Sequence, residues 1–376
     1  MTYQDPLERV VKEVVLPAAE SVDRSATFPR EAVNALAGAG LLALTVPSGY
    51  GGGGAGLPAA TDVVQQLSTA CGSTAMVVMM HYSAVAALVA ADREDVLREI
   101  ATGRHLSTLA FSETGSRSHF WAPLGTATGD GTEIRLNSRK SWVTSASHAD
   151  SYIWSSRPLA APGPMTLWLV RTGTPGLSIG PEFDGLGLRG NDSRPVTGTD
   201  VEVPRTALLG VDGAGLDLAL SAVLPWFLLL NAAASIGLMR AVTGETAEHL
   251  TRTRLRHLDR SLAQLPDSRA QLARMRIETD RTAALLDRTL AALQKGHDDA
   301  QLLVLEVKAA ADGSAAEVAD LAMTACGGAA FRRELGIERR FRDSRAARVM
   351  APTTPALLDF VGRALCGLPL LDGADG

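Results

Sequence analysis

The sequence contains few cysteines, few aromatic residues and no excess of basic charge. Only three cysteines occur in its 376 residues, at positions 71, 326 and 366. Such a sparse, odd-numbered set argues against a disulfide framework or a zinc site and indicates reduced thiols. The formal net charge of -5 argues against a general nucleic-acid surface.

The first residues, MTYQDPLERVVKEV, lack the apolar core of a secretory signal. We therefore expect a cytoplasmic location. A later segment, residues 216–239, is apolar enough to suggest a membrane span, but Pro225 and Asn231 interrupt it. Because a span needs about 20 clean apolar residues, this segment is interpreted as a buried helix, and no membrane partner is expected.

Residue patterns divide the chain into three parts, as its length also suggests. Residues 1–105 read as an N-terminal helical domain. Residues 106–212 contain short runs rich in Trp, Val, Ile and Thr between Gly and Pro, which predicts a small β-barrel or sheet domain. Residues 213–376 show helical periodicity, which predicts a C-terminal four-helix bundle. The expected class is α+β, mainly α.

Individual elements follow from the same patterns. Helices are predicted from Pro29 onward and at 59–68, 73–91, about 270–294 and 306–325. Strands are predicted at 133–136, 141–144, 151–155, 165–170, 177–180 and 196–203.

Several motifs resemble those of the acyl-CoA dehydrogenase superfamily. The first is the run AFSETGSRSH at residues 110–119, which is similar to the family's T-E-P-x-A-G-S-D flavin loop. The resemblance implies that the backbone of Phe111 and the hydroxyls of Ser112 and Ser118 hold the flavin ring. Thr114 replaces the family's Pro, and His119 replaces its Asp.

A second motif, RKSWVTS at residues 139–145, resembles K-x-W-I-T-N. In the family this Trp packs on the flavin ring and this Thr meets the flavin N5 atom, which implies these roles for Trp142 and Thr144. An aromatic plane can cover a large ring, and a short donor can tune the atom that receives hydride.

Further motifs imply an assembly with shared flavin sites. The run GLGLRGNDS at 185–193 resembles a structural family passage that closes the β-domain. Gly327 and Gly328 match glycines that approach the FAD of a neighbouring subunit, and Arg254 matches an Arg that contacts the same FAD. Thr353 keeps the Thr of the family's Y-E-G-T and is assigned to the cofactor site. A homodimer or homotetramer is therefore expected.

The family's catalytic base is missing from both of its usual positions. Ala351 occupies the Glu position of Y-E-G-T, and an alternative position on the first bundle helix falls near Phe227. Neither side chain can accept a proton. Among substitutes, His119 is preferred, because histidine is the side chain most suited to proton transfer near neutral pH, and Glu113 in the same loop is the second candidate. Asp359 and His81 are further alternatives, although a lone His on an apolar helix is more often a core residue.

Three functions remain open on the sequence. The preferred one is an FAD-dependent oxidoreductase that acts on an acyl thioester, carried by CoA or an acyl carrier protein, with hydride transfer to flavin N5 and a relocated or absent base. The second is a flavin-dependent monooxygenase of the same superfamily, which uses oxygen and reduced flavin, with FMN as an alternative cofactor. The third is a non-catalytic flavin-binding or scaffold protein. An electron-transfer partner would serve the first function, and a flavin reductase the second.

Overall fold

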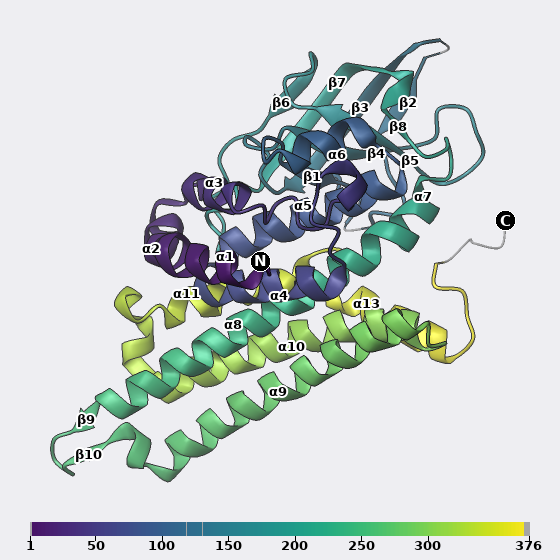
Figure 1. Ribbon diagram of the computed structural model, residues 1–376. Helices are drawn as coiled ribbons and strands as arrows, with labels where there is room; N and C mark the ends of the chain where they lie inside the picture. The colour runs from purple at the N-terminus through teal and green to yellow at the C-terminus, as the bar shows by residue number, and fades with distance from the viewer. Residues whose placement is uncertain (1, 118, 130, 372–376) are drawn as a thin grey trace. The chain divides into compact units, whose positions relative to one another are not determined.

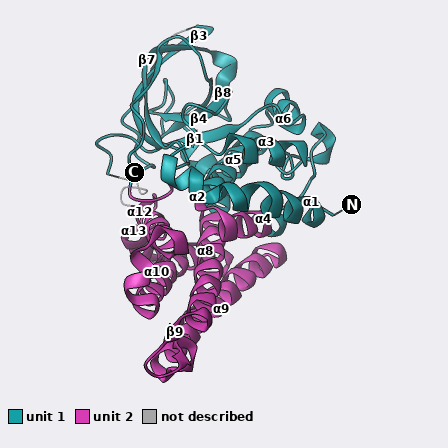
Figure 2. Cartoon of the chain, turned by 90° about the vertical axis from the view of Figure 1, so that its left-hand side faces the viewer, with its two compact units in different colours: residues 1–60, 73–185, 189–227 teal, residues 61–72, 186–188, 228–376 magenta. Residues whose placement is uncertain are grey.

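The computed structural model describes residues 2–117, 119–129 and 131–371. The chain forms two compact units (Figure 2). The first comprises residues 1–60, 73–185 and 189–227, and the second comprises residues 61–72, 186–188 and 228–376. The α+β class is confirmed, with N-terminal helices, central strands and C-terminal helices along the chain (Figure 1). The three-part division at residues 105 and 212 stays a prediction.

The N-terminal part of the chain forms helices. They are α1 (Gln4–Val10), η1 (Val11–Val15), α2 (Leu16–Ser25), α3 (Arg30–Gly38), η2 (Ser48–Tyr50), α4 (Leu57–Ala70), α5 (Gly72–Ala90) and α6 (Glu94–Ala101). Three of them, α3, α4 and α5, match the individually predicted segments, and the others lie in the region expected to be helical. Every residue of α5 from Ser73 to Leu88 is buried. This helix is apolar on all sides, as expected of a helix surrounded by protein.

The strands form two four-stranded sheets in the first unit. Their bounds are β1 (Ser107–Ala110), β2 (Thr126–Thr128), β3 (Glu133–Val143), β4 (Ser151–Ser156), β5 (Thr166–Arg171), β6 (Leu177–Ile179), β7 (Arg194–Pro204) and β8 (Leu208–Leu209). One sheet has the order β1-β4-β5-β8 and the other β2-β3-β7-β6. The sheets do not close into a single barrel, so the sheet alternative of the expectation holds. The two predicted strands at 133–136 and 141–144 are one strand, β3.

One apolar core joins the two sheets. Trp154 on β4 and Trp168 on β5 are fully buried, together with Ile134 and Leu136 on β3 and Val196 on β7. Side chains alternate along a strand, so the inward residues of each sheet meet in this core. Burial of these large side chains is the main force that holds β3 in place.

The C-terminal part of the chain is helical. It contains α7 (Gly215–Leu218), η4 (Ala219–Val223), α8 (Leu224–Arg252), η5 (Leu262–Gln264), α9 (Pro266–Lys295), α10 (Ala300–Cys326), η6 (Gly327–Phe331), η7 (Arg333–Leu335), α11 (Ile337–Asp343), α12 (Ala346–Val349) and α13 (Thr354–Leu365). A two-stranded hairpin, β9 (Arg254–Leu255) and β10 (Arg260–Ser261), lies between α8 and α9. Within the second unit, α10 packs against α9 and α13.

Sequence signals explain where α9 begins and ends. Pro266 stands in the first turn, where its missing N–H leaves no bond unmade. The helix ends before Gly296, which has a φ of 65° and takes the left-handed conformation.

Two helices are long and apolar enough to cross a membrane by composition alone. They are Gly72–Ala90 and Gly215–Arg252, and most of each apolar window is buried inside the protein. Burial of this extent is expected of core helices, which pass the same test, and it agrees with the interpretation of residues 216–239 as a buried helix.

Candidate functional site

The loop that follows β1 is bonded directly to β3. The backbone N–H of Ser141 donates to the Ser112 carbonyl (2.9 Å), and that of Thr114 donates to the Arg139 carbonyl (2.9 Å). These bonds place the predicted flavin residues Phe111 and Ser112 beside the end of β3. The two motifs at residues 110–119 and 139–145 therefore form one site. Ser118 lies outside the described residues.

Glu113 anchors this loop through a buried ion pair with Lys140. Its Oε1 accepts bonds from the Lys140 Nζ (2.6 Å) and from the Ser138 hydroxyl (2.7 Å). Its Oε2 accepts the backbone N–H groups of Leu124 and Gly125. Burial raises the pKa of Glu113, but the Lys140 ammonium and these hydrogen bonds outweigh it and hold the pKa below its ordinary value.

The contacts of Glu113 decide its role. Each carboxylate oxygen already accepts two hydrogen bonds, and the side chain is 2 % exposed. A base must present a free lone pair to the substrate proton. Glu113 is therefore part of the framework of the site and is not available as a base.

His119 has a different environment at the end of the same loop. Its Nδ1 lies 2.8 Å from the Ser116 carbonyl oxygen, which can only accept, so Nδ1 carries the proton. The Nε2 atom is then the proton-accepting nitrogen of the neutral ring. The ring of Trp121 packs against the imidazole edge-on, with centroids 4.9 Å apart, and His119 is exposed. This geometry suits a general base.

Trp142 is turned outward by a β-bulge. Residues 134, 136, 138 and 140 of β3 are buried, and continued alternation would bury residue 142 as well. Between Lys140 and Val143, however, β3 has one residue more than its partner β7. The extra residue reverses the alternation, so that Val143 is buried and the Trp142 side chain is 66 % exposed.

The bulge places Trp142 in a costly backbone conformation. Its φ is +59°, a region that bulky L-residues rarely adopt. Strain of this kind persists only where the surroundings impose it, and it concentrates at functional sites. An exposed indole held in this way offers a free aromatic face.

Thr144 lies two residues after Trp142, directly after the last residue of β3. It is 4 % exposed. The next residues are bonded to the segment before β7, since the N–H of Ser145 donates to Asn191 O (2.9 Å) and that of Ala146 to Asp192 O (3.1 Å). Backbone hydrogen bonds thus hold the residues on both sides of Trp142 and Thr144, through Ser141 to Ser112 and through Ser145 and Ala146 to the segment before β7.

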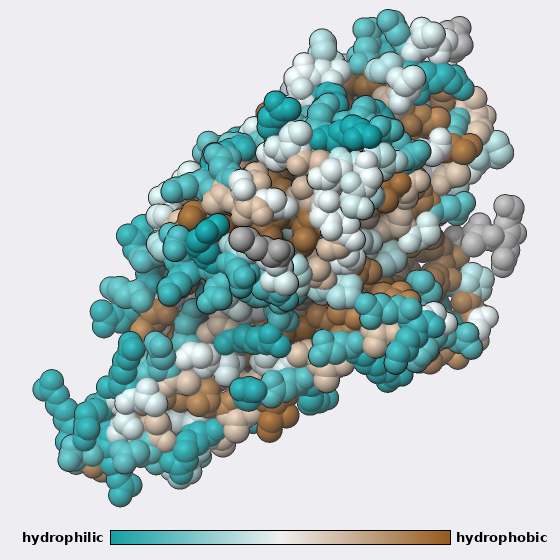
Figure 3. Space-filling view, in the orientation of Figure 1, coloured by the Kyte–Doolittle hydropathy of each residue, from teal (hydrophilic) through white to brown (hydrophobic). Residues whose placement is uncertain are grey.

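The other predicted cofactor residues lie in the second unit. Arg254 on β9 is exposed and pairs with Asp259 (2.6 Å); the surface around this hairpin is mainly hydrophilic (Figure 3). Gly327 has φ 56° and ψ −141°, which only glycine adopts readily. A Cβ at Gly327 or Gly328 would meet no atom of this chain within 4 Å. Space beside both glycines is therefore open to a cofactor or another subunit.

The loop that carries Ala351 and Thr353 is held from inside the second unit. Buried Lys308 donates to Asp312 Oδ2 (2.7 Å), to the Ala347 carbonyl (3.0 Å) and to the Pro352 carbonyl (3.1 Å). Thr353 is the extended residue before α13. Sequence reasoning missed Lys308, although its i,i+4 spacing to Asp312 in an apolar helix was a usable signal.

The remaining substitute bases are engaged elsewhere. His81 is fully buried, with Nε2 3.0 Å from the Leu42 carbonyl and Nδ1 accepting the Ser107 N–H. Burial lowers its pKa to about 4. Asp359 on α13 pairs with Arg363 (2.9 Å) at the surface. Phe227 is buried and apolar.

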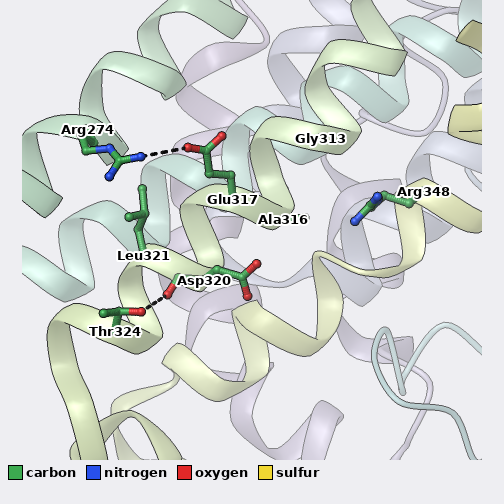
Figure 4. A pocket seen from close by; sticks show the side chains of 8 residues that line it. All are labelled: Arg274, Gly313, Ala316, Glu317, Asp320, Leu321, Thr324 and Arg348. Carbon is green, nitrogen blue, oxygen red and sulfur yellow. Dashed lines mark hydrogen bonds and ion pairs between the residues drawn. The ribbon is translucent and has the colours of Figure 1, made fainter.

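A pocket of about 370 Å³ lies on the second unit (Figure 4). Side chains of α9, α10 and α12 line it: Arg274, Gly313, Ala316, Glu317, Asp320, Leu321, Thr324 and Arg348. Arg274 lies 3.6 Å from Glu317, and the Thr324 hydroxyl donates to the Asp320 carbonyl (2.9 Å). None of the predicted flavin or base residues lines this pocket.

The chain matches family models along nearly its whole length. Residues 2–104 match the N-terminal domain of acyl-CoA dehydrogenases, residues 108–201 the middle domain and residues 213–366 the C-terminal domain. The structure resembles butyryl-CoA dehydrogenase from Megasphaera elsdenii with a TM-score of 0.90 and 21% identity, covering 97% of this chain and 99% of that one.

Curated relatives support the same family. Human mitochondrial short-chain specific acyl-CoA dehydrogenase is 29% identical over 214 residues, which span 55% of this chain and about half, 52%, of that protein. Cyclohex-1-ene-1-carbonyl-CoA dehydrogenase of Geobacter metallireducens is 26% identical over 369 residues, or 96% of each chain. The chain therefore belongs to the acyl-CoA dehydrogenase superfamily of flavin-dependent oxidoreductases.

Proposed function

We propose that this enzyme is an FAD-dependent oxidoreductase that removes hydrogen from an acyl thioester. The carrier of the acyl group is CoA or an acyl carrier protein. The observation that supports the proposal most strongly is the outward position of Trp142, which the bulge in β3 maintains against the backbone preference of a bulky residue. Burial of this indole in the core would stabilise the fold, so its exposure supports a role in covering a ligand ring.

The residues of both units suit FAD. In the first unit, Phe111 and Ser112 lie beside Trp142 and Thr144, so that backbone amides, a hydroxyl and an aromatic plane are available together. In the second unit, Gly327 and Gly328 leave backbone open to close approach. When bound, FAD would accept a hydride from the β-carbon of the acyl group. The Trp142 plane would cover the ring, and Thr144 would lie at N5.

The α-proton needs an acceptor, and His119 is our candidate. Its Nδ1–H is bonded to Ser116 O, which leaves Nε2 as the proton-accepting nitrogen of the neutral ring. Trp121 restricts the ring from one side. A base that is oriented in this way contributes about 10²- to 10⁴-fold to a proton transfer.

Anaerobic reduction of the bound flavin tests the proposal. Purified protein should show a flavin absorption spectrum. Acyl-CoA esters of different chain lengths should reduce the flavin and bleach its absorbance in the absence of oxygen. His119→Gln should keep the spectrum but slow bleaching by about 10²-fold or more, whereas His297→Gln, at another exposed histidine, should not. Unchanged bleaching in His119→Gln would disprove its role as base. A protein that binds no FAD would contradict the flavin assignment and favour a non-catalytic scaffold.

A second function, a flavin-dependent monooxygenase, is favoured by one observation. Both usual base positions carry apolar side chains, Ala351 and Phe227, and an oxygen-transferring reaction needs no α-proton acceptor. This alternative requires reduced FAD or FMN from a reductase. Oxygen uptake that depends on NADH and a flavin reductase, together with no anaerobic bleaching by any acyl thioester, would support it over the first proposal.

The proposed assembly rests on the family resemblance, and the proposed location rests on the residues at the start of the sequence. We propose a homodimer or homotetramer in the cytoplasm, in which the open backbone at Gly327 and Gly328 faces the cofactor of a neighbouring subunit. The dehydrogenase reaction would also require an electron-transfer partner to reoxidise the flavin. Light scattering of the purified protein would establish the number of subunits.

A further inference from the structure

The segment between β6 and β7 supplies an aromatic partner for Trp142. Phe183 in this segment is half-buried. Its ring meets the Trp142 indole edge-on, with centroids 5.8 Å apart and planes at 86°. Edge-to-face contact at this distance is a favoured arrangement of aromatic pairs. Both residues belong to the first unit.

Gly185 makes room for the Phe183 ring. A Cβ at residue 185 would lie 1.8 Å from Phe183 Cζ and 2.2 Å from Cε1. The ring tip therefore occupies the space that a side chain at residue 185 would need. The backbone of Gly185 is outside the positive-φ region, so the space and not the conformation requires a glycine. The glycine thus allows Phe183 to lie across the loop and reach Trp142.

Because of the bulge, the Trp142 side chain does not pack against the core as an inward-facing strand residue does. Its side chain is 66 % exposed and points away from the core of the two sheets. Among the described residues, Phe183 is the aromatic side chain that contacts this indole. An exposed side chain gains several rotamers, and each rotamer would present a different plane to a ligand.

We propose that Phe183 is a positioning residue that holds the Trp142 indole in the plane required to cover the flavin ring. The inference rests on the proposed function, because it assumes that FAD binds against Trp142. Phe183 itself does not need to touch the cofactor. Gly185 contributes to the same positioning, because a side chain there would displace the Phe183 ring.

Three variants test whether Phe183 positions the Trp142 indole. Phe183→Leu removes the ring, Gly185→Ala displaces it, and Phe183→Tyr retains it as the matched control. We expect the first two to weaken FAD binding by about 3- to 10-fold, as loss of an aromatic pair would, and Phe183→Tyr to bind as the unmodified protein does. In a Trp142→Phe background, Phe183→Leu should have a much smaller effect, because the indole is the group that it positions.

A second readout needs no cofactor. Acrylamide quenching of tryptophan fluorescence in the FAD-free protein, with Trp142→Phe as the reference that removes one of the five tryptophans, isolates the Trp142 signal. Phe183→Leu and Gly185→Ala should each increase quenching of this signal, and circular dichroism should show that both variants remain folded.

The two readouts separate the two hypotheses. Unchanged quenching in both variants would overturn the role of Phe183, whether or not FAD binds. Loss of FAD affinity that is equally large in the Trp142→Phe background would also overturn it. If no protein, including the unmodified one, binds FAD while quenching changes as expected, the proposed function fails and the support of Trp142 by Phe183 stands.

Discussion

The ammonium of Lys140 and the carboxylate of Glu113 lie 2.6 Å apart, with side-chain exposures of 0 % and 2 %. The pair joins β3, which carries Trp142, to the loop that ends at His119. Lys140 also donates to the Ser155 carbonyl (2.6 Å) and hydroxyl (2.8 Å) on β4. One buried cation therefore ties three segments of the candidate flavin site together.

Removal of one partner of this pair should destabilise the protein strongly. In Lys140→Met the Glu113 carboxylate stays buried without its counter-charge, and we expect a loss of about 3–5 kcal/mol in the free energy of unfolding. Arg135→Met on the same strand is the control, since the Arg135–Glu202 pair is exposed and should contribute less than about 1 kcal/mol. Urea denaturation measures both. Equal losses in the two variants would contradict a special role for the buried pair.

Glycine should be better tolerated than alanine at residue 142. Trp142 has a φ of +59°, where a residue with a Cβ loses about 1 kcal/mol relative to glycine. We therefore expect Trp142→Gly to be more stable than Trp142→Ala by about 1 kcal/mol, opposite to the order at an ordinary strand position. Both variants should lose FAD affinity at least about tenfold, because both remove the aromatic plane. Thermal unfolding and FAD titration provide the two measurements, and the reverse stability order would show that the bulge relaxes without Trp142.

Restoration of the missing carboxylate tests whether the rest of the site is intact. Lys308 donates to the carbonyls of Met350 (3.4 Å) and Pro352 (3.1 Å), on either side of Ala351, so the backbone at residue 351 is held independently of its side chain. Ala351→Glu should speed anaerobic bleaching by acyl-CoA by about 10²-fold, and Ala351→Gln, of equal size without a base, should not. Stopped-flow absorbance at the flavin band would show the difference. No gain in Ala351→Glu would mean that residue 351 does not face the α-carbon.

Stability should fall as the pH is lowered from about 6.5 to about 4. Burial lowers the pKa of His81 to about 4, below the value of about 6.5 in an unfolded chain. In this window the unfolded state binds a proton that the folded state does not, so protons favour unfolding. The loss from His81 is about 3 kcal/mol. The pKa values of His105, His148 and His249 are also lowered, mainly by burial, and these histidines act in the same direction.

Replacement of His81 isolates its share of this effect. His81→Asn should reduce the slope of unfolding free energy against pH by up to one proton between pH 4 and 6.5, at some loss of stability at neutral pH. His297→Asn, at an exposed position, should leave the slope unchanged. An unchanged slope in His81→Asn would show that His81 is protonated in the folded protein.

The sequence alone determined the succession of helices, strands and helices. Periodicity located α5 and α9 closely and α10 except for its first six residues, because such long helices depend on repeated local pattern and on Pro and Gly at their ends. The same holds for β4 to β7, which short apolar runs between turn residues mark clearly. The resemblance of its motifs to the family also pointed to Trp142, Thr144 and His119, and it placed Ala351, which cannot accept a proton, at the usual base position.

Only the tertiary structure determined which of these side chains are exposed and which are buried in ion pairs. The bulge in β3 depends on the register with β7, which pairing across distant segments sets, and it alone turns Trp142 outward. Glu113 looked like a candidate base in the sequence, but its burial against Lys140 made it an anchor. Whether a charged side chain is a free base or half of an ion pair depends on neighbours brought together by folding, and local sequence does not specify those neighbours.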